Sequence, residues 1–211
     1  MRQHLLWWLR SQQRDYLLNT PCPWLVFDAI LALRAQMRPD MRVFEYGSGG
    51  STLFWLANQA TQVVSIEHNP EWFRVVSERV RGKSAIDIRL VLPEALEQPD
   101  HRHDPADPAL YQSDDEEFRG CSFQKYASQI DAFPDESFDV LLVDGRARPS
   151  CIAHGAAKVK VGGMLILDNA ERAYYLDKTQ QHLRSFAGRF LAGMGPRNPA
   201  VWTTVLFVRR S

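Results

Sequence analysis

The stretch Met41-Arg-Val-Phe-Glu-Tyr-Gly-Ser-Gly-Gly-Ser51 decides the fold of this chain. A short apolar run ends in Val43 and Phe44, glycines follow at positions 47, 49 and 50, and from Leu53 onward apolar residues recur with helical spacing. This order predicts a strand, a tight glycine turn and a helix. Glycine lets the backbone approach a ligand closely, and a helix N-terminus presents unpaired N–H groups. We therefore expect the turn to bind a nucleotide-like ligand.

Three details around the turn narrow the choice of ligand. A dinucleotide fingerprint starting at Gly47 would require glycine at position 52, where this chain has Thr52. The phosphate loop of nucleotide hydrolases requires a lysine at the end of the turn, and the sequence has no lysine between positions 41 and 62. Glu45 precedes the turn, and its carboxylate would repel a pyrophosphate but suit a cationic ligand. S-adenosylmethionine, which carries an ammonium and a sulfonium, fits this pattern.

At these positions the chain resembles the class I S-adenosylmethionine-dependent methyltransferases. Their first motif, an acidic residue followed by x-Gly-x-Gly-x, is similar to the stretch 45–51. A second acid, Glu67, ends an apolar run and lies 20 residues after Gly47, where such folds place a carboxylate on ribose hydroxyls. The alternative is an ordinary tight turn with a surface glutamate. The resemblance implies the cofactor-binding set Glu45, Gly47, Ser48, Gly49, Ser51, Thr52, Glu67, His68 and Asp144.

The rest of the chain supplies the elements of this fold, and the resemblance extends over residues 41–208. The runs that end at Glu67, Asp144 and Asp168 are nearly continuous in apolar residues, which predicts interior parallel strands. Apolar and polar residues alternate over 86–92, as in an edge strand, and residues 190–192 and 201–208 predict a terminal antiparallel hairpin. Further helices are expected over 69–82, 123–130, 149–159 and 173–187. The resemblance implies one three-layer α/β/α domain with a seven-stranded, mostly parallel, Rossmann-like sheet.

An N-terminal helical extension, residues 1–38, precedes the methyltransferase domain, residues 39–211, within one globular unit. The sequence predicts helices over 1–19 and 24–36, the first with an apolar side formed by Leu5, Leu6, Trp8 and Leu9. These helices would cover the mouth of the site, cap the sheet, or pair two copies of the chain as a homodimer through Trp7 and Trp8.

Residues 93–120 read as a long polar loop, rich in proline and acidic residues, that acts as a lid or a mobile insertion. Within it, His101-Arg102-His103-Asp104 has the composition of a metal site. No apolar residues surround it to hold ligands in place, so we interpret the segment as a solvated loop.

Oxygen ligands follow two of the predicted strands, at Asp144 and at Asp168-Asn169. Such a set suits Mg²⁺ or another divalent cation, which would lower the pKa of an acceptor hydroxyl. The chain is similar here to metal-dependent O-methyltransferases of the catechol and caffeoyl-coenzyme-A type, but it has Gly145-Arg146-Ala147-Arg148 where they carry a lysine-bearing turn. The three residues could equally contact the cofactor or cap helices without an ion.

Asp144, Asp168 and Arg146 form the candidate catalytic set. Arg146 and Arg148 could clamp an acidic group of the acceptor or simply lie in solvent. His68 could act as a base or line the cofactor pocket. The signature that amino methyltransferases place after the fourth strand is absent, so oxygen is the expected acceptor atom. We expect methyl transfer to a small molecule or glycan. The alternatives are a catalytically silent, cofactor-binding partner subunit and a nicotinamide-dependent oxidoreductase.

The composition of the chain bears on its possible partners and on its location. The 211 residues include 25 Lys plus Arg and 25 Asp plus Glu, so no overall basic field would draw the chain to nucleic acid or an anionic membrane. No apolar run reaches the length of a membrane span. Cys22, Cys121 and Cys151 are far apart in the sequence, which favours reduced thiols and a cytoplasmic location over a disulfide framework.

Overall fold

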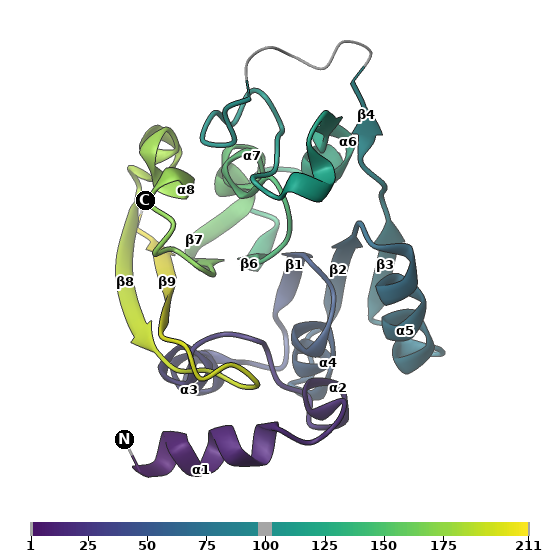
Figure 1. Ribbon diagram of the computed structural model, residues 1–211, viewed down its shortest axis with the longest axis vertical. Helices are drawn as coiled ribbons and strands as arrows, with labels where there is room; N and C mark the ends of the chain where they lie inside the picture. The colour runs from purple at the N-terminus through teal and green to yellow at the C-terminus, as the bar shows by residue number, and fades with distance from the viewer. Residues whose placement is uncertain (1, 97–102, 211) are drawn as a thin grey trace.

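A seven-stranded sheet forms the centre of the protein in a computed structural model that describes residues 2–96 and 103–210 (Figure 1). The strand order is β3-β2-β1-β6-β7-β9-β8, and only the two pairs that involve β9 are antiparallel. The strands are β1 (Arg42–Tyr46), β2 (Gln62–Glu67), β3 (Ile86–Leu90), β6 (Phe138–Val143), β7 (Val159–Leu167), β8 (Phe186–Gly193) and β9 (Trp202–Arg209). The predicted class, the edge position of β3 and the terminal hairpin are confirmed.

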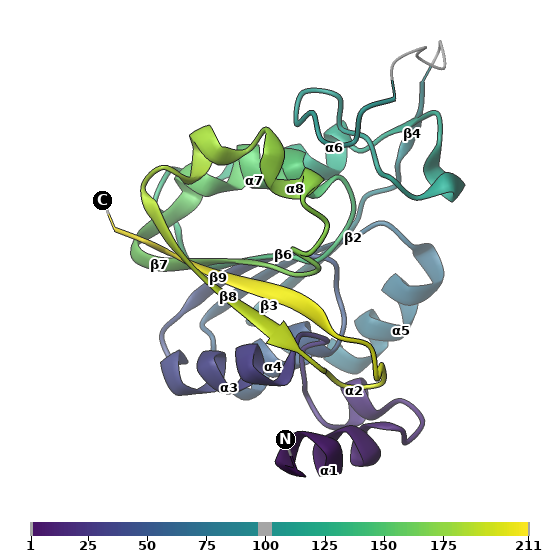
Figure 2. The same cartoon turned by 60° about the vertical axis from the view of Figure 1, so that its left-hand side comes forward.

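Helices cover both faces of the sheet (Figure 2). One face carries α3 (Phe27–Gln36), α4 (Gly50–Ala57) and α5 (Pro70–Val80). The other carries α6 (Gln124–Ala127), α7 (Arg148–Gly155) and α8 (Tyr174–Asp177). The N-terminal helices α1 (Arg2–Ser11) and α2 (Tyr16–Asn19) lie outside the layer of α3 and α4. The three-layer architecture is therefore present, with an additional helical segment on one side.

Alternating side chains along the strands build an apolar core on each face of the sheet. In β1, Phe44 and Tyr46 join the cluster that contains α6 and α7, whereas Val43 joins the cluster that contains α3 and α4. In β6, Leu141 and Leu142 divide in the same way. Because both faces are covered, these strands carry nearly continuous apolar runs, and this is why the sequence identifies them clearly.

The N-terminal segment differs from the single helix predicted over 1–19. The chain bends between α1 and α2, where Asp15 adopts a left-handed φ of 54°. The Trp7 ring stacks on Phe27 with ring centroids 4.4 Å apart and donates its Nε1–H to the Tyr16 hydroxyl at 2.9 Å. The exposed apolar side chains of α1 are Leu5, Leu6 and Leu9. Tryptophan rather than leucine therefore attaches α1 to the domain.

The helix predicted over 173–187 is wrong in length. The chain forms the short helix α8, a 3-10 helix η4 (Gln180–Leu183) and then enters β8 at Phe186. Tyr175, Leu183 and Phe186 all pack on the same apolar cluster, but Phe186 does so as the first residue of β8, which pairs with β9. The expected helices over 24–36, 123–130 and 149–159 are present as α3, as α6 followed by the 3-10 helix η2 (Ser128–Ala132), and as α7 followed by η3 (Ala156–Lys158).

The polar loop is more structured than expected in its described part. A short antiparallel pair, β4 (Glu94–Ala95) and β5 (Cys121–Ser122), closes its base, and a 3-10 helix η1 (Glu116–Phe118) lies within it. The Pro108 carbonyl accepts a hydrogen bond from Ser150 at 2.8 Å, and Lys178 pairs with Asp104 at 2.6 Å. His101 and Arg102 lie outside the described residues.

Within the ranges 2–96 and 103–210, no helix is long and apolar enough to cross a membrane.

Candidate functional site

A cavity of about 620 Å³ opens at the carboxyl ends of β1, β2, β6 and β7. We call it the main cavity. Its floor is the glycine turn, and its walls include the β2 end at Glu67 and His68, the β6 end at Asp144, and the β7 end at Asp168. The opposite wall is formed by residues far away in the sequence, which are Leu17, Trp24, Asn198, Ala200, Val201 and Trp202. The cavity thus occupies the crevice where open α/β sheets bind ligands.

The glycine turn is compressed between two parts of the chain. Gly47 has a left-handed φ of 96°, and a Cβ at this position would lie 3.0 Å from the Asp144 carbonyl oxygen. At Gly50, the first residue of α4, a Cβ would lie 2.2 Å from the Cys22 carbonyl oxygen. A side chain at either position would displace backbone, and these glycines are therefore required by close packing as well as by any ligand.

The backbone N–H groups of the turn bond within the protein. Gly47 N–H donates to the Ile66 carbonyl at 2.9 Å, Ser48 N–H to Glu67 Oε2 at 3.0 Å, and Gly49 N–H to Thr52 Oγ1 at 2.9 Å. A phosphate cradle needs such donors free to face the ligand. These three are occupied, which agrees with the sequence argument against a pyrophosphate.

Glu45 does not face the main cavity, and its expected contact with a cationic ligand is corrected here. The side chain is fully buried and accepts hydrogen bonds from the Trp55 indole at 2.8 Å, from the Ser65 hydroxyl at 2.7 Å and from the Thr52 hydroxyl. Burial raises the pKa of the Glu45 carboxyl. Thr52 is also fully buried and does not line the cavity. Glu45 and Thr52 anchor α4 beneath the turn.

Glu67 lines the main cavity, and its carboxylate binds the glycine turn at Ser48. Its Oε2 accepts from the Ser48 hydroxyl at 2.9 Å as well as from the Ser48 N–H, and its Oε1 accepts from the N–H groups of His68 and Asn69 at 2.8 and 2.9 Å. Burial raises the pKa of Glu67, but the hydrogen bonds and the neighbouring His68 outweigh it and lower the pKa. Three of these four hydrogen bonds come from backbone N–H groups, which hold the carboxylate in place, and the fourth comes from the Ser48 hydroxyl.

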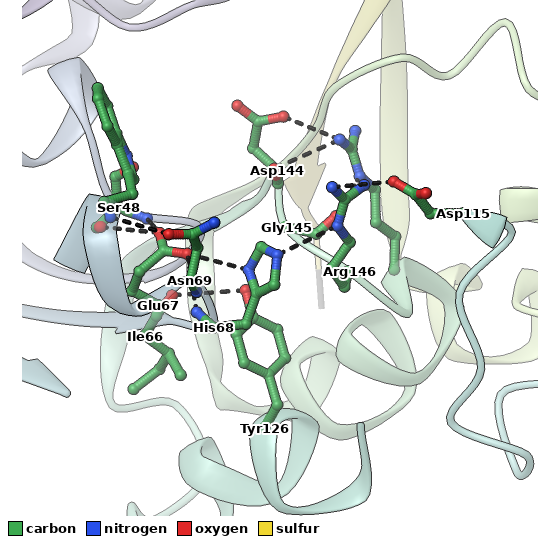
Figure 3. Close-up of polar contacts among 12 residues, drawn as sticks. Ser48, Ile66, Glu67, His68, Asn69, Asp115, Tyr126, Asp144, Gly145 and Arg146 are labelled. Carbon is green, nitrogen blue, oxygen red and sulfur yellow. Dashed lines mark hydrogen bonds and ion pairs between the residues drawn. The ribbon is translucent and has the colours of Figure 1, made fainter. Parts of the chain in front are cut away.

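His68 connects the β2 end to the polar loop (Figure 3). Its Nδ1 lies 3.0 Å from Glu67 Oε1, and its Nε2 accepts a hydrogen bond from Arg146 Nε at 3.3 Å. Arg146 in turn pairs with Asp115 at 3.1 Å and stacks over the Phe118 ring at 5.2 Å. The predicted residues His68 and Arg146 are thus brought together, and they fix the described part of the loop against the cavity.

Arg148, two residues further, lies inside the protein with an exposed fraction of 7%. Its Nη2 pairs with Asp144 Oδ1 at 3.1 Å, its Nε donates to the Gly145 carbonyl at 3.0 Å, and its Nη1 donates to the Asp168 carbonyl. Burial raises the pKa of Asp144 to about 6, although the Arg148 charge lowers it. Asp144 stays a quarter exposed to the cavity.

Asp168 has a different environment from Asp144. Its Oδ1 accepts hydrogen bonds from the Trp202 indole at 3.0 Å and from the Thr204 hydroxyl at 2.5 Å, both on β9. Burial first, and then the charge of Asp144, raise its pKa to about 8. Arg148 bonds the Asp168 backbone carbonyl rather than its carboxylate. The pKa of Asp168 is therefore raised further than that of Asp144.

The predicted metal set of Asp144, Asp168 and Asn169 does not fit a divalent ion as it is arranged. The guanidinium of Arg148 already bonds oxygen atoms of Asp144 and Asp168, and the Asp168 carboxylate accepts from β9. Asn169 has a left-handed φ of 51° and lines the main cavity. Across the described residues, no group of three or more His, Cys, Asp or Glu side chains could hold a metal ion.

A second cavity of about 450 Å³, which we call the side cavity, adjoins the main cavity. The two share Gly145, Arg146, Arg148 and Arg172. Its other walls are Tyr174 and Tyr175 from α8 and the loop residues Gln112–Asp115. Arg172, Tyr174 and Tyr175 are site residues that the sequence alone does not predict. Their position just after Asp168-Asn169 was the one sequence signal for a role in the site. The helix predicted over 173–187 gave no indication that the chain turns here and brings them to the site.

Most of the predicted site residues meet at the main cavity, and the exceptions are Glu45 and Thr52. The predicted residues that line it are Gly47, Ser48, Gly49, Ser51, Glu67, His68, Asp144, Arg146, Asp168 and Asn169.

The fold is similar to that of several solved methyltransferases. An O-methyltransferase from Bacillus cereus in complex with SAH aligns at 14% identity and a TM-score of 0.57, over 99% of this chain and 88% of that one. An rRNA methylase from Streptococcus thermophilus aligns at 13% identity and a TM-score of 0.55, over 87% and 96%. A precorrin-6y C5,15-methyltransferase from Geobacter metallireducens aligns at 12% identity and a TM-score of 0.54, over 87% of each chain. No family model and no curated protein matches the sequence. The chain has the class I S-adenosylmethionine-dependent methyltransferase fold.

Proposed function

We propose that this chain, which has the class I methyltransferase fold, transfers a methyl group from S-adenosylmethionine to an oxygen atom of a small molecule or glycan. The observation that carries the proposal is the pair of adjoining cavities. One lies over the glycine turn and Glu67, and the other opens from it at the turn 145–148. A two-substrate reaction needs two sites that meet where the group is transferred.

The main cavity is the proposed cofactor site. Glu67 is the candidate ligand for ribose hydroxyls, and the Ser48 hydroxyl now donates to the carboxylate oxygen to which such a hydroxyl would donate. When bound, S-adenosylmethionine supplies an electrophilic methyl group on its sulfonium. No pyrophosphate-binding N–H groups are needed for this ligand, which is consistent with the occupied turn.

The side cavity is the proposed acceptor site. At about 450 Å³ it falls in the ordinary range for small-molecule pockets. Arg172, which bonds the Tyr175 hydroxyl at 3.1 Å, and the neighbouring Tyr174 supply polar groups that can orient a hydroxylated acceptor.

Asp144 is the proposed general base. Its pKa of about 6 leaves it mostly ionised near neutral pH but basic enough to accept a proton from an acceptor hydroxyl. It lies at the β6 end, next to Gly145, which lines both cavities. Asp168 would influence the reaction only through its electrostatic effect on Asp144, because its own carboxylate is hydrogen-bonded to β9.

Partners and location belong to the proposal as well. The exposed Leu5, Leu6 and Leu9 of α1 are the surface through which we propose a homodimer, in place of the tryptophans. We propose no nucleic-acid partner, because acidic and basic residues are equal in number. A cytoplasmic location is consistent with the three free cysteines.

Calorimetric titration with S-adenosylhomocysteine tests the proposal. We expect wild-type protein to bind it and Glu67→Gln to bind it at least about tenfold more weakly, since one carboxylate oxygen is lost. The matched control is Glu71→Gln, an exposed glutamate in the first turn of α5. NAD, titrated in parallel, should not bind. Binding of NAD but not of S-adenosylhomocysteine would instead indicate an oxidoreductase.

A cofactor-binding partner subunit without catalysis is the second candidate function. Methyl transfer from labelled S-adenosylmethionine to a small-molecule extract separates the two. Transfer by the wild type that is lost in Asp144→Asn supports the enzyme, whereas cofactor binding without transfer to any extract supports the subunit.

A further inference from the structure

The strand-end carboxylates of the candidate site enclose a cation that belongs to the chain itself. Arg148 is 7% exposed, and the acceptors of its guanidinium are the Gly145 and Asp168 carbonyls together with the carbonyl and carboxylate of Asp144. The Tyr175 ring lies 5.2 Å from its central carbon and covers one side. Nε, Nη1 and Nη2 therefore all donate to oxygen.

These contacts fix Arg148 whatever the charge of Asp144. Three of the four acceptors are backbone carbonyls, which do not titrate and cannot rotate away. The backbone also constrains the side chain, because Ala147 has a left-handed φ of 44° and Arg148 is the first residue of α7. Arg148 is thus a fixed charge, in contrast to Arg146, which is a third exposed and pairs with a loop residue.

A divalent ion at this place would compete directly with the guanidinium. It would need oxygen atoms from the β6 and β7 ends, and Arg148 already bonds Asp144 Oδ1 and the Asp168 carbonyl. The ion would also add charge next to a buried positive group, where repulsion is only weakly screened. The remaining carboxylate, Asp168, already accepts two hydrogen bonds from β9.

We propose that the Arg148 guanidinium is the built-in cation of the candidate active site, in the position that a divalent ion would otherwise take. Arg148 is a positioning residue that holds Asp144 at the junction of the two cavities. The positioning role rests on the proposed function, whereas the exclusion of metal concerns this chain whatever its reaction.

Titration with Mn²⁺, followed by electron paramagnetic resonance, tests the exclusion directly on metal-free protein. We expect no specific site in the wild type. In Arg148→Met, which keeps an unbranched side chain but removes the charge, we expect one Mn²⁺ per chain, bound at least about tenfold more tightly than by the wild type. The added site should disappear again in the double variant Arg148→Met/Asp144→Asn.

Two further variants separate exclusion by charge from a general loss of structure. Arg148→Lys keeps the charge and should exclude Mn²⁺ as the wild type does. Arg146→Met removes the neighbouring, partly exposed arginine and should create no metal site. Should Arg148→Met not fold, Arg148→Gln, which also removes the charge but keeps a side chain that can donate a hydrogen bond to a carbonyl, takes its place in the titration.

Two results would overturn the proposal. One is a wild-type Mn²⁺ site that is lost in Asp144→Asn, because the guanidinium would then not exclude the metal. The other is the absence of Mn²⁺ binding in a folded Arg148→Met variant, because Arg148 would then not occupy a cation position. Neither result depends on S-adenosylhomocysteine binding, so failure of this inference is distinguishable from failure of the proposed function.

Discussion

Two glutamates that flank the glycine turn illustrate how environment assigns the role of a residue. Glu45 is the next-to-last residue of β1 and Glu67 is the last residue of β2, and the sequence assigns both to the cofactor. Glu45 ends up fully buried under α4 with three side-chain donors, whereas Glu67 ends up in the cavity wall with mainly backbone donors. A buried carboxylate with this many donors serves the fold, because removing it would leave those donors unpaired.

We predict that Glu45→Gln keeps S-adenosylhomocysteine affinity within a few-fold, and that Glu45→Ala loses about 3 kcal/mol of unfolding free energy. The amide of glutamine can still accept from Trp55 and can donate to a hydroxyl, whereas alanine leaves Trp55, Ser65 and Thr52 without an acceptor. Urea denaturation and calorimetry measure the two quantities. If Glu45→Gln loses ligand binding as Glu67→Gln does, Glu45 contacts the cofactor after all.

We predict that the protein loses stability as the pH rises from about 5 to 8, and that Asp168→Asn removes most of this loss. The folded pKa values of Asp144 and Asp168, about 6 and about 8, lie above their ordinary value of 3.8. In this window the folded state binds more protons than the unfolded state, so its free energy of unfolding falls with rising pH by up to about 1.4 kcal/mol per pH unit for each excess proton.

Denaturant titrations at several pH values measure this slope. Asp177→Asn, which changes an exposed aspartate of α8, is the control and should follow the wild type. A wild-type stability that instead rises between pH 5 and 8 would contradict the raised pKa values.

At the scale of elements, the glycine turn links the N-terminal segment to the sheet. On one side, Gly47 approaches the β6 end, and on the other, Gly50 approaches the backbone of Leu17 and Cys22. The turn between β8 and β9 is tied to the same segment, since Phe27 N–H donates to the Met194 carbonyl at 2.9 Å and Arg197 N–H to the Ser11 hydroxyl at 2.8 Å. The outer wall of the main cavity therefore depends on contacts between the two ends of the chain.

We predict that Gly50→Ala destabilises the protein by about 1–3 kcal/mol and weakens S-adenosylhomocysteine binding. The added methyl would lie 2.2 Å from the Cys22 carbonyl oxygen and 2.8 Å from that of Leu17, so the segment that carries Trp24 must move. Gly193→Ala, where a Cβ meets no atom within 4 Å, is the matched control. Equal stability of the two variants, measured by urea denaturation, would mean that the contact at Gly50 relaxes freely.

For the whole molecule, the N-terminal segment and the sheet share one apolar core. Tyr16, Val26 and Phe27 belong to the same buried cluster as Trp55 and Trp202, on the face of the sheet that carries α3 and α4. The N-terminal extension, residues 1–38, and the methyltransferase domain, residues 39–211, are therefore distinct in the sequence but packed together in the fold. A shared core of this kind favours cooperative unfolding.

We predict a single unfolding transition that coincides by tryptophan fluorescence and by circular dichroism. Three of the six tryptophans, Trp7, Trp8 and Trp24, lie in the N-terminal segment, so its separation would change a large part of the fluorescence, whereas circular dichroism reports mainly on the helices and sheet of the domain. Equilibrium urea denaturation followed by both signals is the measurement. An earlier fluorescence transition, before the loss of secondary structure, would show that the N-terminal segment separates from the domain first.

The sequence by itself determined the sheet, its edge strand β3 and the glycine turn. Covered strands carry continuous apolar runs, and a tight turn requires glycine, so both appear in the local order of residues. Local order also brought Glu67, Asp144 and Asp168 to the cavity, because parallel strands end at one edge of a sheet.

Only the tertiary structure decided what these side chains contact. In the folded chain Glu45 bonds Trp55 and does not line the cavity, and Asp168 accepts hydrogen bonds from β9. Arg148 is buried between the ends of β6 and β7. The tertiary structure also ended α8 early, which brought Tyr174 and Tyr175 to the side cavity. Each of these outcomes depends on partners distant in the sequence, and local patterns carry no information about such partners until the chain has folded.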